Sequence, residues 1–244
     1  MKKLILFDVD GPLTWPRENA KENILDVLSK LKKRDDVVIG FVGGSKIDMY
    51  TEQFGSGLFG LFDYCFAENG LVAYKGEELI YEGDLVKEFK ESDLVEFIDY
   101  NLKYISELKL PKKRGTFVQF RSGLINISPI GRDCSSEERK EFNEYDKEHG
   151  VRKKMIAELE GKFKHLNLKY SIGGMISFDV MPEGWDKTFC LRHIELDNFD
   201  EIYFFGDKTE IGGNDYEIYS HPQVKGIRVE NPNDTIRIVS EKFL

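Results

Sequence analysis

The sequence predicts an α/β protein: a doubly wound parallel β-sheet into which a smaller α+β domain is inserted. Three short apolar runs indicate the sheet, at residues 4–7, 37–42 and 202–205, and each ends in glycine or polar residues. Continuous apolar strands of this kind are typical of a parallel sheet that is covered on both faces. Residues 83–184 follow a different pattern and indicate the inserted domain.

A helix-forming segment follows the first apolar run. Parallel strands require a crossover connection, which is usually a helix, and residues 19–33 repeat apolar side chains with the helical period. This alternation of strand and helix indicates a Rossmann-like core built from residues 1–82 and 185–244. The apolar positions of the helical segment are Ile24, Leu25, Leu28 and Leu31.

The inserted domain shows the pattern of antiparallel β-structure. Apolar and polar positions alternate in residues 116–130, on both sides of Ser122-Gly123, which predicts a β-hairpin. Residues 175–181 alternate in the same way and predict another half-buried strand. An antiparallel sheet is therefore expected in this domain.

Two helices are predicted beside that sheet. One covers about 92–108, and the other covers 135–148. Ser135 and Glu138 have the spacing of a capping box, in which each side chain accepts from a backbone N–H at the start of the helix. Antiparallel strands with helices on one side are typical of an α+β module, which we interpret as a cap domain.

The composition restricts the partners and the compartment. The chain has 44 acidic and 35 basic residues, a net charge of −9 that disfavours nucleic-acid binding. No apolar run approaches the roughly 20 residues that span a bilayer, and the four apolar residues before Asp8 are too few for a signal peptide. The three widely spaced cysteines form no CxxC pair and fit a reducing compartment. We therefore expect a cytoplasmic protein that binds neither nucleic acid nor membrane.

Polar residues at the ends of the apolar runs form the candidate site. Asp8 and Asp10 follow the first run, Ser45 follows Gly43-Gly44 after the second, and Asp207 follows the third. In open α/β sheets, ligands bind outside the carboxyl ends of the strands. The sequence therefore predicts that these four side chains converge.

The pair Asp8 and Asp10 suits phosphoryl transfer. Side chains two positions apart on a strand point to the same side, so one carboxylate can attack phosphorus while the other gives or takes a proton. Because close carboxylates repel each other, a divalent cation is expected, and Mg²⁺ prefers oxygen ligands such as Asp207. A D-x-D pair alone is more often a strand exit or a turn, so its occurrence together with Ser45 and Lys187 carries the prediction.

Three further segments each have an ordinary alternative. The Ser45 hydroxyl and nearby backbone N–H groups can hold phosphoryl oxygens, although Gly-Gly-Ser is also a common turn. Lys187 can stabilise a phosphorylated aspartate or the charge of the transition state, although most lysines are solvated at the surface. Residues 212–215 supply an amide and a carboxylate that can position a metal, or form an ordinary turn.

In this order, D-x-D-G, a strand-end serine, a lysine and a G-D pair resemble the haloacid dehalogenase superfamily. The closer resemblance is to the eukaryotic phosphomannomutases, and it extends over nearly the whole chain. It implies a haloacid dehalogenase-like core with an inserted cap and a homodimer formed through the cap. The segments that carry the resemblance are FDVDG, VGGS, AENGLVAYK, LPKKRGTF, PIGR, SSEER, SIGGMISFDVMPEGWDK, LRH, YFFGDKT and GGNDYE.

The resemblance implies roles for the core candidates. Asp8 is the nucleophile that becomes an aspartyl phosphate, Asp10 is the general acid/base, and Lys187 completes the catalytic set. The Mg²⁺ ligands are Asp8, the backbone carbonyl of Asp10, and Asp207.

The resemblance also implies a set of substrate-binding residues. Planar, bidentate arginines suit the phosphate that is not reacting, and a serine and an aspartate of the cap hydrogen-bond the sugar hydroxyls. One of these arginines, Arg139, has the alternative of pairing with glutamates on its own helix. The set is Arg17 and Ser45 in the core, and Arg121, Arg132, Arg139, Ser177 and Asp179 in the cap.

The implied reaction interconverts mannose 6-phosphate and mannose 1-phosphate and supplies GDP-mannose synthesis. A phosphorylated Asp8 gives its phosphoryl group to the hexose phosphate, and the resulting bisphosphate returns the other one. A hexose 1,6-bisphosphate is implied as the activator that primes the cycle. Two alternatives stay open: a phosphosugar phosphatase of the same superfamily, and a non-catalytic sugar-phosphate-binding protein.

Two places depart from the family pattern. Pro12 stands where the family has Thr or Val, and proline removes a backbone N–H and restricts Gly11. We expect an altered rate and not a loss of activity. His221 and Val224 stand where the family has an Asp and a Thr that bind an additional cation, so that site lacks its side-chain ligands here.

Overall fold

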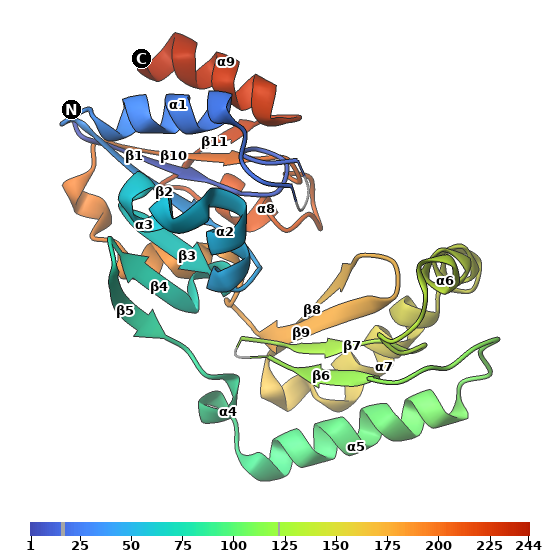
Figure 1. The fold of residues 1–244 in the computed structure, drawn as a ribbon. Coiled ribbons are helices and arrows are strands. Elements are labelled where there is room, and N and C mark those ends of the chain that lie inside the picture. The colour runs from blue at the N-terminus through green and yellow to red at the C-terminus, as the bar shows by residue number, and fades with distance from the viewer. Residues whose placement is uncertain (16–17, 122) are drawn as a thin grey trace. The chain divides into compact units, whose positions relative to one another are not determined.

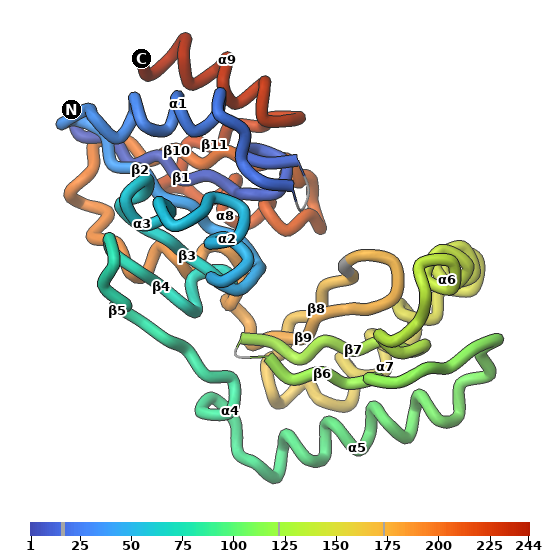
Figure 2. The backbone as a smooth tube through the Cα atoms, viewed as in Figure 1, coloured from blue at the N-terminus to red at the C-terminus, as the bar shows by residue number. Residues whose placement is uncertain are grey.

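The computed structural model describes residues 1–15, 18–121 and 123–244 (Figures 1 and 2). Its contacts divide the chain into two compact units. The core unit comprises residues 1–83 and 185–244, and the cap unit comprises residues 84–184. No helix of the described residues is both long enough and apolar enough to cross a membrane.

The core unit is built on a seven-stranded sheet with the order β11-β10-β1-β2-β3-β4-β5. Strand β1 pairs in parallel with both β10 and β2, which confirms the predicted parallel core. Strands β4 and β5 are antiparallel additions at one edge, and the sequence patterns did not reveal them. The strands are β1 (Lys3–Phe7), β2 (Val37–Val42), β3 (Tyr64–Ala67), β4 (Val72–Lys75), β5 (Glu78–Glu82), β10 (Glu201–Gly206) and β11 (Lys225–Arg228).

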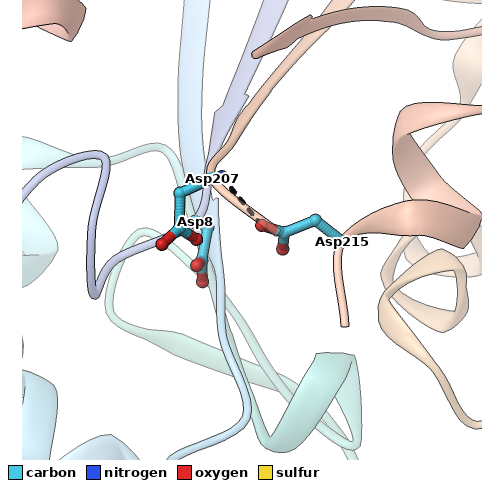
Figure 3. Close-up of side chains that lie close together, drawn as sticks. All are labelled: Asp8, Asp207 and Asp215. Atoms are coloured by element: carbon cyan, nitrogen blue, oxygen red, sulfur yellow. Dashed lines mark hydrogen bonds between the residues drawn. The ribbon is translucent and has the colours of Figure 1, made fainter. Parts of the chain in front are cut away.

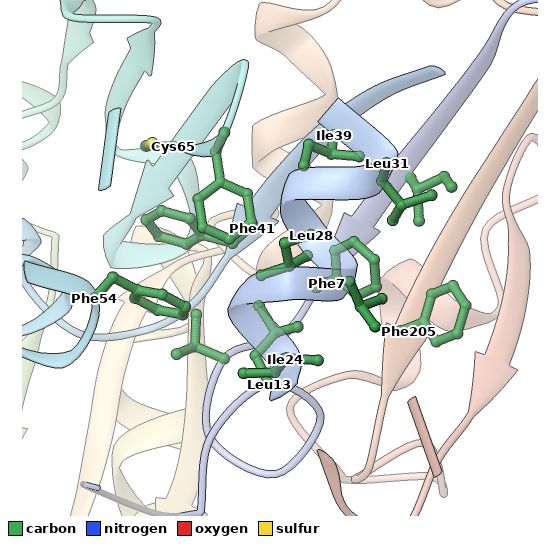
Figure 4. Packing of buried hydrophobic residues seen from close by; sticks show 14 of the residues in the cluster. Phe7, Leu13, Ile24, Leu28, Leu31, Ile39, Phe41, Phe54, Cys65 and Phe205 are labelled. Carbon is green, nitrogen blue, oxygen red and sulfur yellow. The ribbon is translucent and has the colours of Figure 1, made fainter. Parts of the chain in front are cut away.

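The two faces of this sheet are both buried. Because side chains alternate along a strand, Ile5 and Phe7 of β1 join one apolar cluster while Leu4 and Leu6 join another. The Phe7 ring stacks on Phe205 of the neighbouring strand, with 4.9 Å between ring centroids (Figure 4). Burial on both sides explains why the core strands of the sequence are continuous apolar runs.

Helices cover both faces of the core sheet. The first cluster is covered by α1 (Glu22–Lys32), α2 (Ile47–Phe54), α3 (Leu58–Leu61) and α9 (Pro232–Phe243). The second is covered by α8 (Tyr216–Tyr219) and a 3-10 segment, Lys187–His193. The helix predicted at 19–33 begins only at Glu22, because the Ala20 N–H donates to the carbonyl of Gln53 and holds the preceding backbone outside the helix.

The cap unit contains a four-stranded antiparallel sheet with the order β6-β7-β9-β8. The predicted hairpin is confirmed by the β6–β7 pairing, although Ser122 of its turn lies outside the described residues. The strand predicted at 175–181 is β9, which begins two residues later and ends one residue later. The strands are β6 (Val118–Phe120), β7 (Ile125–Ile127), β8 (Leu168–Gly173) and β9 (Ser177–Pro182).

The cap helices are α4 (Leu85–Glu88), α5 (Glu91–Glu107), α6 (Ser136–His149) and α7 (Val151–Lys162). Both predicted helices are confirmed, and α6 begins with the predicted capping box of Ser135 and Glu138. Helices α5 and α7 lie along one face of the sheet (Figure 1). The opposite face is therefore the one that carries polar side chains, and it includes candidate residues of the cap.

Candidate active site

Lys187 lies between two buried carboxylates at the carboxyl edge of the core sheet. Its Nζ is 2.5 Å from Asp8 Oδ1 and 2.6 Å from Asp215 Oδ1. Its side chain is 1% exposed, so Lys187 is not a solvated surface lysine. A lysine is buried in this way only when carboxylates compensate its charge. The contact with Lys187 therefore fixes the Asp8 carboxylate in place.

Asp215 is the residue that ties the lysine to the end of β10. Its Oδ2 accepts from the backbone N–H of Asp207 at 3.0 Å (Figure 3). It also accepts from the backbone N–H of Lys208 at 3.0 Å. A Cβ on Gly206 would lie 2.7 Å from this oxygen, so only glycine permits the approach. The sequence indicated that Asp215 could position a metal, but the pairing with Lys187 emerges only in the structure.

Asp207 completes an acidic cluster with Asp8 and Asp215. The three residues each offer a carboxylate oxygen, and these oxygens lie within 4.8 Å of one another (Figure 3). Asp207 Oδ1 is buried and has no hydrogen-bond partner among the described residues, whereas both oxygens of Asp215 already accept hydrogen bonds. The arrangement therefore fits a hard divalent cation at Asp8 and Asp207, with Asp215 as a support.

Burial and the neighbouring charges together shift the pKa values of this cluster. Burial raises the pKa of Asp8 to about 6, against the lowering effect of Lys187. Burial also raises the pKa of Asp207. For Lys187, burial favours the neutral amine, but the carboxylates of Asp8 and Asp215 more than offset it and the pKa is raised. Lys187 therefore stays positively charged, and a second cation would further stabilise the ionised carboxylates.

Asp10 is held by a polar contact that the sequence did not predict. Its Oδ1 accepts from Gln53 Nε2 at 3.0 Å and from Thr14 Oγ1 at 3.3 Å. Gln53 lies on α2 and is 5% exposed. No spacing rule distinguishes a glutamine at this helical position from a surface residue, so only the packing of α2 on the loop reveals it.

The loop that carries Asp10 tolerates Pro12. The N–H groups of Leu13 and Thr14 both donate to Val9 O, and the Gly11 N–H donates to Thr14 O. None of these bonds needs an N–H at position 12. Gly11 has φ +117° and a Cβ there would lie 2.6 Å from Asp207 Oδ2, so the conformation and the close approach both require glycine.

Ser45 lies just beyond β2, beside the strand that leads to Asp8. Its backbone N–H donates to Tyr50 Oη at 2.9 Å, so this N–H is not available to a phosphoryl oxygen as the sequence suggested. The reason is the close packing of Tyr50, whose hydroxyl would lie 2.1 Å from a Cβ on Gly43. The Ser45 hydroxyl remains the candidate group. The other core candidate, Arg17, lies outside the described residues.

In the cap unit, three arginines lie near one another. Burial and the charges of Arg121 and Arg139 lower the pKa of Arg132. Arg139 donates to the carbonyls of Arg132 and Cys134, so it does not pair with glutamates of its own helix. In the described residues none of the three forms an ion pair with a carboxylate within 4.0 Å. Three neighbouring guanidinium groups without such an ion pair favour an anionic ligand.

Ser177 and Asp179 are adjacent on one face of β9. Both interact with the same residue, Asn126 of β7, whose amide donates to Ser177 Oγ at 3.1 Å and to Asp179 Oδ1 at 2.6 Å. Asn126 did not emerge from the sequence, because an asparagine in a short strand gives no pattern of its own. The cap sheet therefore presents hydroxyl, carboxylate and guanidinium groups on one face.

The core and its carboxyl-edge cluster define a haloacid dehalogenase-type protein. The fold is shared with solved structures at low sequence identity. A trehalose-6-phosphate phosphatase from Aspergillus fumigatus superposes with a TM-score of 0.63 at 15% identity and covers 98% of this chain and 92% of its own. The SMU.1108c protein of Streptococcus mutans has a TM-score of 0.66 at 16% identity, over 99% and 98% of the two chains.

Sequence comparison is more specific. The family model of the eukaryotic phosphomannomutases matches residues 24–244. Phosphomannomutases of Dendrobium officinale and Arabidopsis thaliana are each 52% identical over 99% of this chain, and 94% and 96% of their own lengths are covered. Phosphomannomutase 2 of Dictyostelium discoideum is 48% identical over 98% of this chain and 96% of its own. The chain belongs to the eukaryotic phosphomannomutase family.

Proposed function

We propose that this chain is a phosphomannomutase that interconverts mannose 6-phosphate and mannose 1-phosphate. The observation that carries the proposal is the buried Asp8 carboxylate, which directly follows β1 and lies beside Lys187 within the acidic cluster. A binding protein has no need of a carboxylate that is buried, oriented by a lysine and left able to attack phosphorus. Membership of the family supports the same reaction.

The proposed cycle begins with Asp8 as an aspartyl phosphate. A sugar hydroxyl attacks this phosphorus, the bond between phosphorus and the Asp8 oxygen breaks, and Asp10 takes the hydroxyl proton. The hexose bisphosphate then presents its other phosphate, Asp8 attacks that phosphorus, and Asp10 returns the proton to the departing sugar oxygen. Gln53 holds the Asp10 carboxylate through this exchange, and Lys187 stabilises the charge on the transferring group.

Magnesium is proposed at Asp8, the carbonyl of Asp10, and Asp207. The unpartnered, buried Asp207 Oδ1 supports this choice, since such an oxygen is costly unless it finds a cation or a donor. When bound, Mg²⁺ neutralises charge on the phosphoryl oxygens. We expect that chelation abolishes turnover and that Asp207→Asn removes the increase in melting temperature caused by Mg²⁺.

The substrate contacts are proposed on both units. Arg121, Arg132 and Arg139 bind the phosphate that is not reacting, since none of them forms an ion pair with a carboxylate within 4.0 Å among the described residues. Ser177 and Asp179 hydrogen-bond sugar hydroxyls. The remaining proposed contacts are those of Arg17 and of the Ser45 hydroxyl.

The wider setting is also part of the proposal. A hexose 1,6-bisphosphate primes the cycle by phosphorylating Asp8, and the product supplies GDP-mannose synthesis in the cytoplasm. The chain acts as a homodimer formed through the cap unit. Size-exclusion chromatography with light scattering tests the dimer, because a monomeric mass would contradict it.

The central experiment measures conversion of mannose 1-phosphate with Mg²⁺ and a hexose 1,6-bisphosphate. We expect turnover that depends on the bisphosphate, and Asp8→Asn should abolish it because an amide does not act as the nucleophile. Release of inorganic phosphate is measured in parallel. Continuous phosphate release without a bisphosphate requirement would identify a phosphatase, and unchanged turnover in Asp8→Asn would refute the mechanism.

A further inference from the structure

A row of polar side chains crosses the cap sheet. Gln119 of β6 pairs with Asn126 of β7, Asn126 with Asp179 of β9, and Asp179 with Ser171 of β8. Directly opposed residues of antiparallel strands project from the same face of the sheet. The neighbouring positions of β7 and β9, which project from the other face, are buried and apolar. The row therefore lies on a single polar face.

Asn126 is the centre of this row and is 4% exposed. Its Nδ2 donates to Ser177 Oγ and to Asp179 Oδ1, and its Oδ1 accepts from Arg132 Nη1 at 2.5 Å. Both amide protons and the carbonyl oxygen are therefore used. An amide bonded on both sides is held in one orientation, and it fixes the orientation of the groups that it contacts.

This arrangement determines which partner each group can take. Ser177 Oγ accepts from Asn126, and among the described residues no acceptor takes the Ser177 hydroxyl proton, so that proton is free for a ligand oxygen. Asp179 is partly exposed and keeps acceptor capacity beyond the one amide bond. The face therefore offers one donor and one acceptor side by side, which matches two hydroxyl groups of a sugar ring.

We infer that Asn126 is a positioning residue for recognition of the hexose ring. It sets the Ser177 hydroxyl as a donor, leaves the Asp179 carboxylate as an acceptor, and holds the Arg132 guanidinium beside them. This inference rests on the proposed function and deepens it, because it names the group that imposes the donor and acceptor pattern on the sugar. Asn126 itself is buried and acts through its three partners.

The backbone of β9 at Ser177 is held by Arg152 and not by Asn126. Arg152 Nη1 donates to the carbonyls of Ser177 and Gly174, at 3.0 and 3.1 Å, and its Nε pairs with Asp146 at 2.7 Å. The position of the Ser177 backbone is therefore secured without Asn126. A change at Asn126 alters mainly the orientation and hydrogen bonding of the side chains.

The test uses two variants, Asn126→Ala and the isosteric Asn126→Asp, in the full chain. In Asn126→Asp the Ser177 hydroxyl donates to the new carboxylate, so its proton is lost to the ligand although the volume is kept. We expect kcat/KM for mannose 1-phosphate to fall about 10- to 100-fold in both variants, the effect of one or two hydrogen bonds to charged groups. The matched control is Asn101→Ala, because Asn101 is a fully buried cap asparagine whose amide donates, among the described residues, to the Phe97 carbonyl of its own helix α5.

A double-mutant cycle separates positioning from general damage. If Asn126 acts through Ser177, adding Asn126→Ala to Ser177→Ala costs less than it does alone, since the oriented hydroxyl is already gone. Fully additive losses, or an equal loss in Asn101→Ala, would overturn the inference. So would kcat/KM values within about threefold of the unmodified chain, a difference below 1 kcal/mol.

The outcomes for the inference and for the proposed function are distinct. If the unmodified chain does not convert mannose 1-phosphate with Mg²⁺ and activator, the proposed function fails and the inference falls with it. If the unmodified chain is active but both Asn126 variants keep its kcat/KM, only the inference is wrong. Melting temperatures of all the variants show that the folded protein was assayed.

Discussion

The buried ion triad around Lys187 gives the sharpest prediction of stability. In Lys187→Met a side chain of similar length fills the space, but Asp8 and Asp215 stay buried without the ammonium group that contacts both. Removing one partner of a buried ion pair costs about 3–5 kcal/mol. In a protein of this size that loss lowers the melting temperature by about 6–20 °C.

The assay is thermal and urea unfolding, followed by circular dichroism without divalent cations, because a bound cation would offset the repulsion. Lys32→Met is the matched control, since Lys32 pairs with Asp63 but both side chains are 32% exposed. An exposed pair of this kind contributes about 0–1 kcal/mol. If Lys187→Met loses no more free energy of unfolding than Lys32→Met, the view of Lys187 as a buried cation held by two carboxylates is wrong.

Two other changes test the site and the core. Gln53→Leu removes the hydrogen bond from Gln53 to Asp10. We expect kcat to fall about 10-fold with KM unchanged. An unchanged kcat in steady-state kinetics would contradict this role. Burial lowers the pKa of His193 from 6.5, against a hydrogen bond to Gly70 O. His193 therefore binds its proton more readily in the unfolded chain, and its contribution to stability falls as the pH is lowered through about 6.5. Between about pH 7 and pH 5.5, we expect the urea midpoint to drop by a smaller amount in His193→Gln than in the unmodified chain. Equal drops in the two proteins would exclude His193 as the cause.

Local patterns were enough to predict the strands that lead to the proposed nucleophile, Asp8, and to Asp207 of the acidic cluster. Apolar runs can be read without a structure when a strand is buried on both faces, as β1, β2 and β10 are. The capping box at Ser135 was equally legible, because it depends on residues three positions apart. The antiparallel strands β4 and β5 were missed, since β5, the edge strand, is largely exposed and lacks a continuous apolar pattern.

The order of residues in the sequence identified four candidates: Asp8, Asp10, Lys187 and Asp207. Their order could not show that Lys187 is buried between Asp8 and Asp215, because that contact joins residues far apart in the chain. The pattern around Ser45 also suggested a free backbone N–H, which the packing of Tyr50 removes.

The residues that support the chemistry could be found only in three dimensions. Gln53 occupies an ordinary position of helix α2, and Asn126 occupies an ordinary position of strand β7. Neither a glutamine nor an asparagine at such a position indicates a role in the sequence. Each is important because folding brings it within hydrogen-bond distance of a candidate group, Asp10 in one case and Ser177 in the other. The sequence thus determined which groups are the candidates for the chemistry. The tertiary structure decided which neighbours orient them, because orientation depends on contacts between distant segments.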